Sequence, residues 1–305
     1  MAADTRPPKE SGIRIIVRVL LVVAIIGTVW LLVVLSKPES RPAGPSSTPL
    51  GSQTKRSTPS TPSVIEGHNH TIEDRAYVYA GIPKPLSAGS GCTLLQNEGY
   101  WAGYSESRKN PLWVSYRVFQ IDNPETFPRP SRFKTDPRTA TTVKHRDYTH
   151  SGYDRGHMAP NFAIVSRHGR RAQLETFFMS NICPQNPLLN RGIWKHLEGK
   201  VANKYSNQLE EVWVVTGPIF DNERETLPSG VEIPDQFFKI IVDEDQGLVR
   251  MLAFIIPQEV QRGEQLEGFL TSVDIVEDAA HLDFFWQLAD GLEERLEGVS
   301  TTKMW

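Results

Sequence analysis

Residues 19–35 form an uncharged apolar run near the N-terminus, and this run limits where a globular domain can begin. Together with the mostly apolar residues 13–18, the run is long enough to cross a bilayer core of ~30 Å as a helix. Basic residues precede the run, and only Lys37 follows it closely. The positive-inside bias then places residues 1–12 in the cytoplasm and the rest of the chain outside it. We therefore predict a single-pass transmembrane signal anchor in a lipid bilayer over residues 13–35.

Other targeting segments fit the N-terminus less well. A cleaved signal peptide needs an A-x-A-like site after the apolar run, and Ser36, Lys37 and Pro38 follow it instead. A mitochondrial presequence is Arg-rich, amphipathic and poor in acidic residues, which Asp4 and Glu10 do not suit. We predict a domain on the extracytoplasmic side, in the periplasm or at the cell surface. Secretion after signal cleavage and the mitochondrial inner membrane are the alternatives.

Composition divides the rest of the chain into a linker, a domain and a tail. Residues 36–70 are rich in Pro, Ser and Thr, and they are predicted to be a disordered linker because they cannot bury enough apolar surface to fold. Hydrophobic residues make up 39% of the chain and charged residues 23%, which is typical of a globular protein. We place one folded domain at residues 71–291 and a C-terminal tail at residues 292–305.

The folded domain is predicted to be α+β. Several segments are rich in β-branched and aromatic residues and bounded by turn formers, as strands are. Others carry apolar residues at helical spacing, such as Trp194, Leu197 and Val201. Grouped strands with helices between the groups favour a central mixed or antiparallel sheet flanked by helices. The predicted strands are residues 113–120, 211–216, 237–242 and 249–256, and the predicted helices are residues 167–179, 187–205, 265–270 and 282–292.

Positive charge is concentrated in one segment. The chain has a formal net charge of -3, yet residues 129–171 contain ten Lys or Arg against three Asp, a net charge of +7. A basic segment in an otherwise acidic chain suits a focused phosphate-binding site, although a solvated basic loop has the same composition. The two cysteines, Cys92 and Cys183, lack metal-ligand spacing and are predicted either as a disulfide or as two buried thiols.

The most informative segment reads Asp154-Arg155-Gly156-His157. An Arg and a His separated by one Gly can face the same phosphate, and the Gly lets the backbone approach closely. The imidazole of His157 titrates near neutrality, so it can take a proton from water. The guanidinium of Arg155 is a fixed cation whose planar fork suits phosphate oxygens. These residue types in this order indicate chemistry on a phosphate ester.

A second segment, residues 188–198, adds a metal-binding pattern. On a helix, Asn190, Trp194 and Glu198 are spaced i, i+4 and i+8, so they lie along one ridge. The carboxamide oxygen of Asn190 suits a hard cation, and Mg²⁺ keeps most of its waters and needs few protein ligands. Glu198 is placed to hold those waters or Asn190 itself. By itself this segment also fits a surface helix with a solvated Glu.

Together the two segments resemble the DNA/RNA non-specific endonucleases, a family with the ββα-metal fold. The resemblance implies a Mg²⁺-dependent nuclease, with Mn²⁺ as a substitute, that hydrolyses phosphodiester bonds of DNA and RNA and leaves 5′-phosphate ends. It also implies a homodimer, for which the sequence shows no signature of its own. The matching parts of the chain are residues 100–116, 154–161, 179–198, 214–220 and 282–285.

The resemblance also implies a role for each matching residue. His157 would be the general base that activates water, and Arg155 would neutralise the phosphate. Asn190 would be the direct Mg²⁺ ligand, and Glu198 would hold the water on that ion.

Three further positions concern the surroundings of the site. Asn181 matches a family position that supports the site, and Arg132 corresponds to a second phosphate-binding arginine. A basic residue is expected one helical turn past Glu198, but this chain has Ala202 there. The basic lining is therefore predicted to be thinner than in some members, which affects turnover rate and not mechanism.

Three other functions are compatible with parts of the sequence. A nuclease-fold protein could bind nucleic acid without cutting it, but the intact His157, Asn190 and Glu198 argue against that. A zinc hydrolase that uses His157, His168 and Cys183 fits no common zinc spacing. A cell-envelope interaction protein would not explain why both segments occur in this order.

Overall fold

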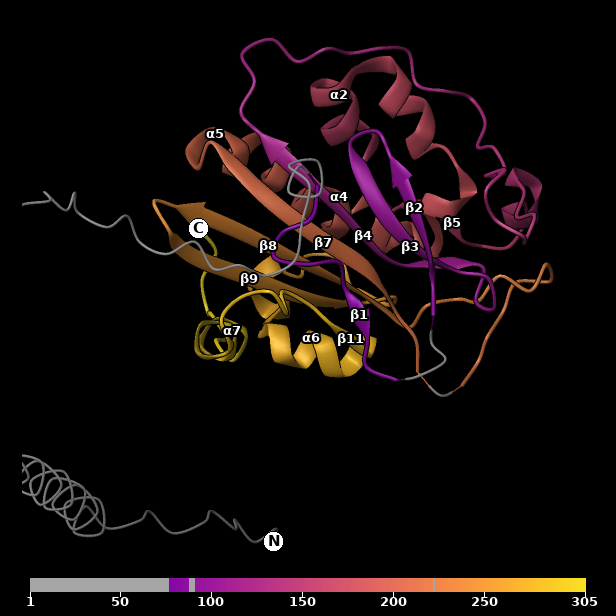
Figure 1. Ribbon diagram of the computed structural model, residues 1–305. Coiled ribbons are helices and arrows are strands. Elements are labelled where there is room, and N and C mark those ends of the chain that lie inside the picture. The colour runs from indigo at the N-terminus through magenta and orange to yellow at the C-terminus, as the bar shows by residue number, and fades with distance from the viewer. Residues whose placement is uncertain (1–76, 88–90, 222) are drawn as a thin grey trace, which may run out of the picture. The chain divides into compact units, whose positions relative to one another are not determined.

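A seven-stranded antiparallel sheet forms the centre of the domain (Figure 1). The computed structural model describes residues 77–87, 91–221 and 223–305. The strand order is β10-β9-β8-β7-β4-β3-β2, and every neighbouring pair is antiparallel. The prediction of an α+β domain around an antiparallel sheet is confirmed. The strands are β2 (Thr93–Asn97), β3 (Tyr100–Ser105), β4 (Asn110–Phe119), β7 (Glu211–Ile219), β8 (Gln236–Asp245), β9 (Leu248–Pro257) and β10 (Leu270–Thr271).

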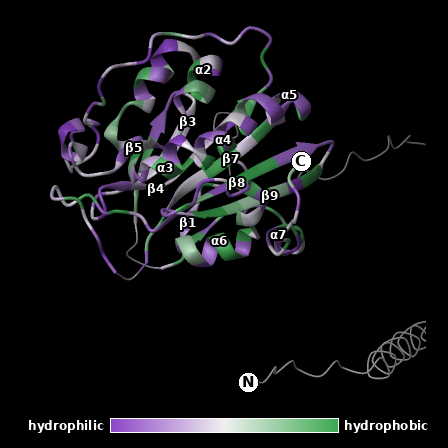
Figure 2. Cartoon of the chain, turned by 180° about the vertical axis from the view of Figure 1, so that it is seen from behind, coloured by the Kyte–Doolittle hydropathy of each residue, from purple (hydrophilic) through white to green (hydrophobic). Residues whose placement is uncertain are grey.

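Apolar side chains alternate between the two faces of this sheet. On β8, Phe237 and Ile241 belong to one core, and Phe238, Ile240 and Val242 belong to the other. Successive side chains of a strand point to opposite faces, so both faces bury apolar surface and both need a cover. Figure 2 shows hydrophobic residues along the central strands β8 and β9.

Helices cover both faces, in two groups that lie on opposite sides of the sheet (Figure 1). Trp194, Leu197 and Val201, the predicted apolar stripe, are buried in the core that contains Phe237 and Ile241, as expected. The group on this face comprises α2 (Asn161–Thr176), α3 (Pro187–Arg191), α4 (Ile193–Gly199), the π-helix η4 (Lys200–Tyr205) and α5 (Ser206–Gln208). The group on the other face comprises α6 (Val273–Ala280) and α7 (Asp290–Glu297).

The helix predicted over residues 187–205 is interrupted at Gly192, between α3 and α4. The backbone of Gly192 leaves helical geometry, with φ of -101° and ψ of -112°. A side chain there would collide with the carbonyl oxygen of Leu188. The helix predicted over residues 167–179 also differs, because α2 already begins at Asn161 and is kinked at Gly169, where φ is 78°.

The prediction of a helix over residues 282–292 is wrong. Leu282–Asp283 is the short strand β11, which pairs with β1 (Lys84–Pro85), and the helix α7 begins only at Asp290. Phe285 is buried and has a φ of 44°, which interrupts any helix at that residue. Burial of this segment against the sheet therefore outweighed its local helical spacing. Residues 265–270 contain only a short 3-10 helix, η5 (Leu266–Phe269).

The predicted anchor at residues 13–35 and the predicted linker at residues 36–70 lie outside the described residues. Within the part that is described, no helix combines the length and the apolar character needed to cross a membrane.

Candidate functional site

A two-stranded ribbon holds the backbone of His157. Asp154–His157 forms β5, which pairs in antiparallel fashion with β6 (Ile182–Gln185). Beyond the strand, the amide of Met158 donates to the carbonyl oxygen of Asn181 at 3.0 Å. Because both sides of His157 are hydrogen-bonded to the same neighbouring segment, the ribbon restricts the position from which its imidazole projects.

The side chain of Asn181 stabilises the loop that follows this ribbon. Its side-chain oxygen accepts a hydrogen bond from the amide of Ala159 at 2.8 Å, and its NH₂ group donates to the carbonyl oxygens of Ala159 and Thr176 at 3.1 and 3.0 Å. The residue is fully buried. Its hydrogen bonds are thus made within the protein, where they hold the loop that follows His157.

The imidazole of His157 packs beside two aromatic rings that also contact each other. The ring centroids of Phe133 and Phe177 are 5.2 and 5.1 Å from that of His157. Burial, together with the nearby charge of Arg129, lowers the pKa of His157 to about 3. The imidazole is therefore neutral at physiological pH and keeps a lone pair that can accept a proton.

Asn190 lies on α3, where Asp154 of β5 holds its side chain. The Nδ2 atom of Asn190 donates to the carboxylate of Asp154 at 2.9 Å, and Arg191 donates to the same carboxylate at 2.7 and 2.5 Å. Burial raises the pKa of Asp154, but the hydrogen bonds from Arg191 and Asn190 outweigh burial and lower it overall. An ionised carboxylate only accepts hydrogen bonds, so the NH₂ of Asn190 must face it and the carboxamide oxygen is directed away.

Glu198 projects from α4 with one oxygen buried. This atom, Oε1, has no hydrogen-bond partner among the described residues; the indole of Trp194 lies nearby but does not meet hydrogen-bond geometry. Burial raises the pKa of Glu198 to about 7, although the charge of Lys239 opposes that rise. A buried carboxylate oxygen without a donor is costly unless a cation or an ordered water satisfies it.

Lys239 is the buried counter-charge of Glu198. Its Nζ donates to the hydroxyl oxygens of Thr216 and Tyr116 at 3.2 and 3.4 Å and lies 4.5 Å from the ring centroid of Trp194. Burial lowers the pKa of Lys239 to about 8, whereas the charge of Glu198 raises it. Each of these two buried groups therefore favours the ionised form of the other.

One cavity of about 590 Å³ brings most of the predicted site residues together. His157 and Arg155 reach it from β5, Asn190 from α3 and Glu198 from α4, so four of the six predicted residues line the same space. Its other lining residues are Arg129, Pro160, Asn161, Phe162, Ala163, Arg191, Lys195, Gly199, Ala202 and Asn203.

Arg155 is partly engaged within the protein. Its guanidinium donates two hydrogen bonds to the carbonyl oxygen of His145, at 3.0 and 2.6 Å, and one to the hydroxyl of Thr149 at 3.3 Å. A guanidinium carries five N–H donors, so donors remain for a phosphate in the cavity. The internal bonds fix the direction of the fork before any substrate binds.

Two predicted residues do not line the cavity. Asn181 lies beneath the ribbon, and Arg132 is an exposed residue outside the lining. Arg129, three positions before Arg132, lines the cavity instead and stacks its guanidinium 5.2 Å from the ring centroid of Phe177. Both arginines belong to one irregular segment, in which no periodic pattern distinguishes which side chain faces inward.

Two further residues of the site were missed from the sequence. Asp154 was visible in the motif but had no assigned role, and its orienting contact with Asn190 depends on β5 lying beside α3. Lys239 falls in an apolar strand, and its polarity among Phe237, Phe238, Ile240 and Ile241 was the one local indication of a special environment.

The donors that converge here suit a hard divalent cation. They comprise the outward carboxamide oxygen of Asn190 and the unsatisfied carboxylate of Glu198, and oxygen donors of this kind favour Mg²⁺ over softer metals. The alternative zinc set does not form: within the described residues, His157, His168 and Cys183 are not a converging group of ligands. Cys183 and Cys92 are both free thiols.

Comparison with known proteins places this architecture in one family. The family model of the DNA/RNA non-specific endonucleases matches residues 80–291. The mitochondrial nuclease of Saccharomyces cerevisiae is 26% identical over 261 residues, which are 76% of this chain and 76% of that protein. Human endonuclease G, a mitochondrial protein, is 30% identical over 210 residues, which are 63% of this chain and 69% of that protein.

A solved structure shows the same likeness in three dimensions. The crystal structure of the EndoG/EndoGI complex, which concerns EndoG inhibition, matches with a TM-score of 0.58 and 26% identity. The match covers 67% of this chain and 90% of that one. The residues that line the cavity, at positions 129–203, fall within the family match at residues 80–291. This chain belongs to the DNA/RNA non-specific endonuclease family, and it is a phosphodiester hydrolase.

Proposed function

We propose that this protein is a Mg²⁺-dependent endonuclease of the ββα-metal type that hydrolyses DNA and RNA, with Mn²⁺ as a substitute cation. The observation that carries the proposal is the convergence of His157, Asn190 and Glu198, from three separate elements, on one cavity. A general base, a hard-cation ligand and a second carboxylate are the groups that metal-assisted phosphodiester hydrolysis requires.

His157 is the general base of this reaction. Its neutral imidazole takes a proton from a water molecule, and the oxygen of that water attacks phosphorus while the bond to the 3′ oxygen breaks. The products carry a 5′-phosphate and a 3′-hydroxyl. The aromatic rings of Phe133 and Phe177 keep the imidazole dry and unprotonated before the substrate arrives.

Asn190 would hold the cation through its carboxamide oxygen, and Glu198 would act on the water around it. The bound ion supplies Lewis-acid stabilisation of the negative charge on the phosphate and the departing oxygen. Asp154 keeps the carboxamide of Asn190 in the required orientation, and the charge of Lys239 favours the ionised form of Glu198. These residues are thus organised without any substrate present.

The positive charge of the cavity supports the prediction of low sequence preference. Arg129, Arg155, Arg191 and Lys195 line it, and Glu198 is the one acidic residue among the lining residues. Cations that contact backbone phosphates position a nucleic acid but read no bases. Both DNA and RNA offer the same phosphodiester, so we expect cutting of both with little regard for sequence.

The test replaces the base and measures cutting. His157→Ala should reduce nicking of supercoiled plasmid by roughly 10²–10⁴-fold, the usual effect of a general base. DNA binding should persist, because the lining arginines remain. The measurement compares plasmid and RNA side by side, with Mg²⁺ and then with EDTA.

A second histidine, on the helix that carries Glu198, supplies the matched control for His157→Ala. His196 lies exposed on α4 and does not line this cavity, so His196→Ala should leave cutting unchanged. If His157→Ala keeps more than about one hundredth of the activity, the role of His157 is wrong. If the pure wild-type protein shows no metal-dependent cutting, the chain is a nucleic-acid binder and not a nuclease.

The cellular setting follows from the N-terminus and from the relatives. We infer that residues 13–35 anchor the enzyme in a bilayer and that the nuclease domain faces away from the cytoplasm. The yeast and human relatives are named as mitochondrial proteins, which supports the mitochondrial alternative among the predicted locations. A homodimer remains a prediction from the family resemblance.

A further inference from the structure

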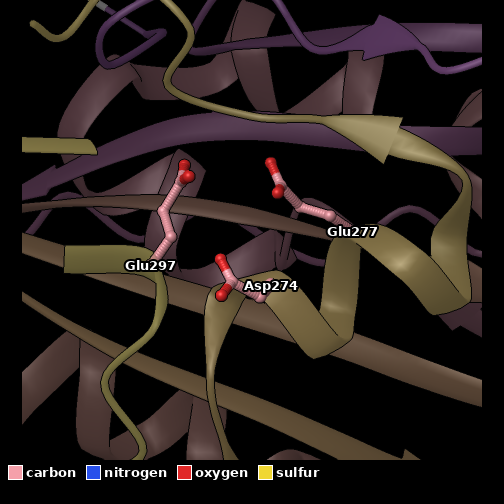
Figure 3. Close-up of side chains that lie close together, drawn as sticks. All are labelled: Asp274, Glu277 and Glu297. Carbon is pink, nitrogen blue, oxygen red and sulfur yellow. The ribbon is translucent and has the colours of Figure 1, made fainter. Parts of the chain in front are cut away.

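Three carboxylates come together on the sheet face opposite the catalytic cavity. Asp274 and Glu277 are one helical turn apart on α6, and Glu297 is the last residue of α7. One oxygen of each lies within 4.8 Å of one oxygen of each of the others. Figure 3 shows the three carboxylates converging on one space between α6 and α7.

Glu297 distinguishes this cluster from an ordinary group of surface carboxylates, because Glu297 is buried. Only 5% of the residue is exposed, and its Oε1 atom is buried without a hydrogen-bond partner among the described residues. Its carboxylate points toward Asp274 and Glu277 (Figure 3). Leaving an anionic oxygen buried and unsatisfied is costly, so this oxygen needs a cation, a donor or a proton.

The protein itself provides little compensation. Glu277 accepts one hydrogen bond, from the amide of Phe284 at 2.7 Å. Asp283 and Glu293 add further negative charge to the surroundings. The nearby cation, Lys84, lies over the ring of Trp286 at 3.0 Å from its centroid and acts on Asp283 and Glu293.

Burial, reinforced by the neighbouring carboxylates, raises the pKa of Glu277 to about 7 and that of Glu297 to about 8. Carboxylates this close disfavour one another's ionised form, and a bound cation would favour it.

We propose that Asp274, Glu277 and Glu297 bind a Ca²⁺ ion that links α6 to α7. Two oxygens that both lie about 2.4 Å from one ion can be at most about 4.8 Å apart, and Ca²⁺ takes oxygen ligands at that distance. Mg²⁺ demands near-octahedral geometry and keeps several of its waters, whereas Ca²⁺ accepts irregular sets of several carboxylates. Asp274 is exposed, which leaves room for the waters that complete the coordination of Ca²⁺.

This site is independent of the catalytic proposal. Its ligands come from α6 and α7, and none of them lines the cavity that contains His157 and Asn190. The expected role is structural: the ion attaches the C-terminal helix α7 to α6, which packs on the sheet through Val273 and Val276.

The experiment titrates Ca²⁺ into the full-length protein after removal of metal with EDTA, and follows both heat of binding and melting temperature. At a Ca²⁺ concentration about 100 times the dissociation constant, the melting temperature of the wild type should rise by roughly 5–10 °C. Glu297→Gln should abolish both the heat of binding and the rise. Because Gln keeps the size of the side chain and carries no charge, this variant should melt no lower than the wild type in EDTA.

Matched variants separate the possible explanations. Glu294→Gln changes an exposed residue of the same helix and should keep the full Ca²⁺ response. Asn190→Ala should also keep it, because that residue belongs to the catalytic cavity. Asp274→Asn, at an exposed position, should weaken Ca²⁺ binding and serves as the second ligand variant if Glu297→Gln fails to fold. A wild type without a Ca²⁺ response, or a ligand variant with an unchanged response, overturns the proposal.

Discussion

At the scale of single residues, the most unusual group is Lys239. It is fully buried in a strand whose neighbours are apolar, and its position on β8 directs it to the side of the sheet that carries α4. A buried cation is costly unless an opposite charge accompanies it. Glu198 is that charge, and the proposed role of Glu198 requires the ionised form.

Lys239→Met should therefore change the pH dependence of the reaction. Loss of the nearby positive charge raises the pKa of Glu198 above about 7, so the acid limb of kcat against pH should move upward by roughly one pH unit or more. At a pH above this raised pKa, Glu198 is an uncompensated buried charge, which should also lower the free energy of unfolding by about 3–5 kcal/mol.

The control for this variant is the double substitution Lys239→Met with Glu198→Gln. It removes both buried charges, so it should recover much of the lost stability while remaining inactive. Chemical denaturation measures the stability, and nicking rates from pH 5 to 9 measure the acid limb. An acid limb that does not move in Lys239→Met would show that Lys239 does not control the ionisation of Glu198.

At the scale of elements, the pairing of β5 with β6 requires a glycine at position 156, because there is no space for a side chain there. A Cβ atom at Gly156 would collide with the side chain of Gln185, which is fully buried on β6. The sequence suggested that Gly156 permits a close approach to the phosphate. The structure shows in addition that it permits the packing of β6 against β5.

Gly156→Ala should separate the two strands and displace His157. Overpacking of this kind should lower the free energy of unfolding by about 1–3 kcal/mol. A displacement of about 1 Å at a catalytic group can reduce the rate by ~10²-fold, so cutting should fall more than stability suggests. Nicking rate and thermal melting measured on the same sample test both effects.

A second substitution shows whether the collision is the cause. Gly156→Ala combined with Gln185→Gly removes the opposing side chain and should restore part of the activity. Gln185→Gly alone serves as the reference for the lost packing. Equal activity of Gly156→Ala with and without Gln185→Gly would mean that the glycine acts through the substrate and not through β6.

At the scale of the whole molecule, the residues that the structure describes form one compact unit. The C-terminus belongs to this unit, because the backbone oxygen of Trp305 accepts a hydrogen bond from Lys204 at 2.5 Å and its ring packs against Tyr205.

Deletion of residues 1–35 should consequently leave cutting unchanged and release the protein from membranes. The kcat of the shortened protein should stay within about twofold of that of the full chain, because none of the cavity residues is removed. Membrane fractionation and nicking of plasmid provide the two readouts. Continued sedimentation of the shortened protein with membranes would contradict the predicted anchor.

The residue types and their local order determined the chemistry of this protein. The enrichment in β-branched and aromatic residues marked four central strands, and the segments around His157 and Asn190 indicated phosphate and metal chemistry, because these are patterns between near neighbours in the chain. The tertiary structure decided the rest. It placed Arg129 and not Arg132 in the cavity lining and brought the charge of Lys239 close to Glu198. It also brought a carboxylate oxygen of Glu297 to within 4.8 Å of one of Asp274. Such contacts depend on how sheet and helices pack over long separations, and no local periodicity encodes that packing.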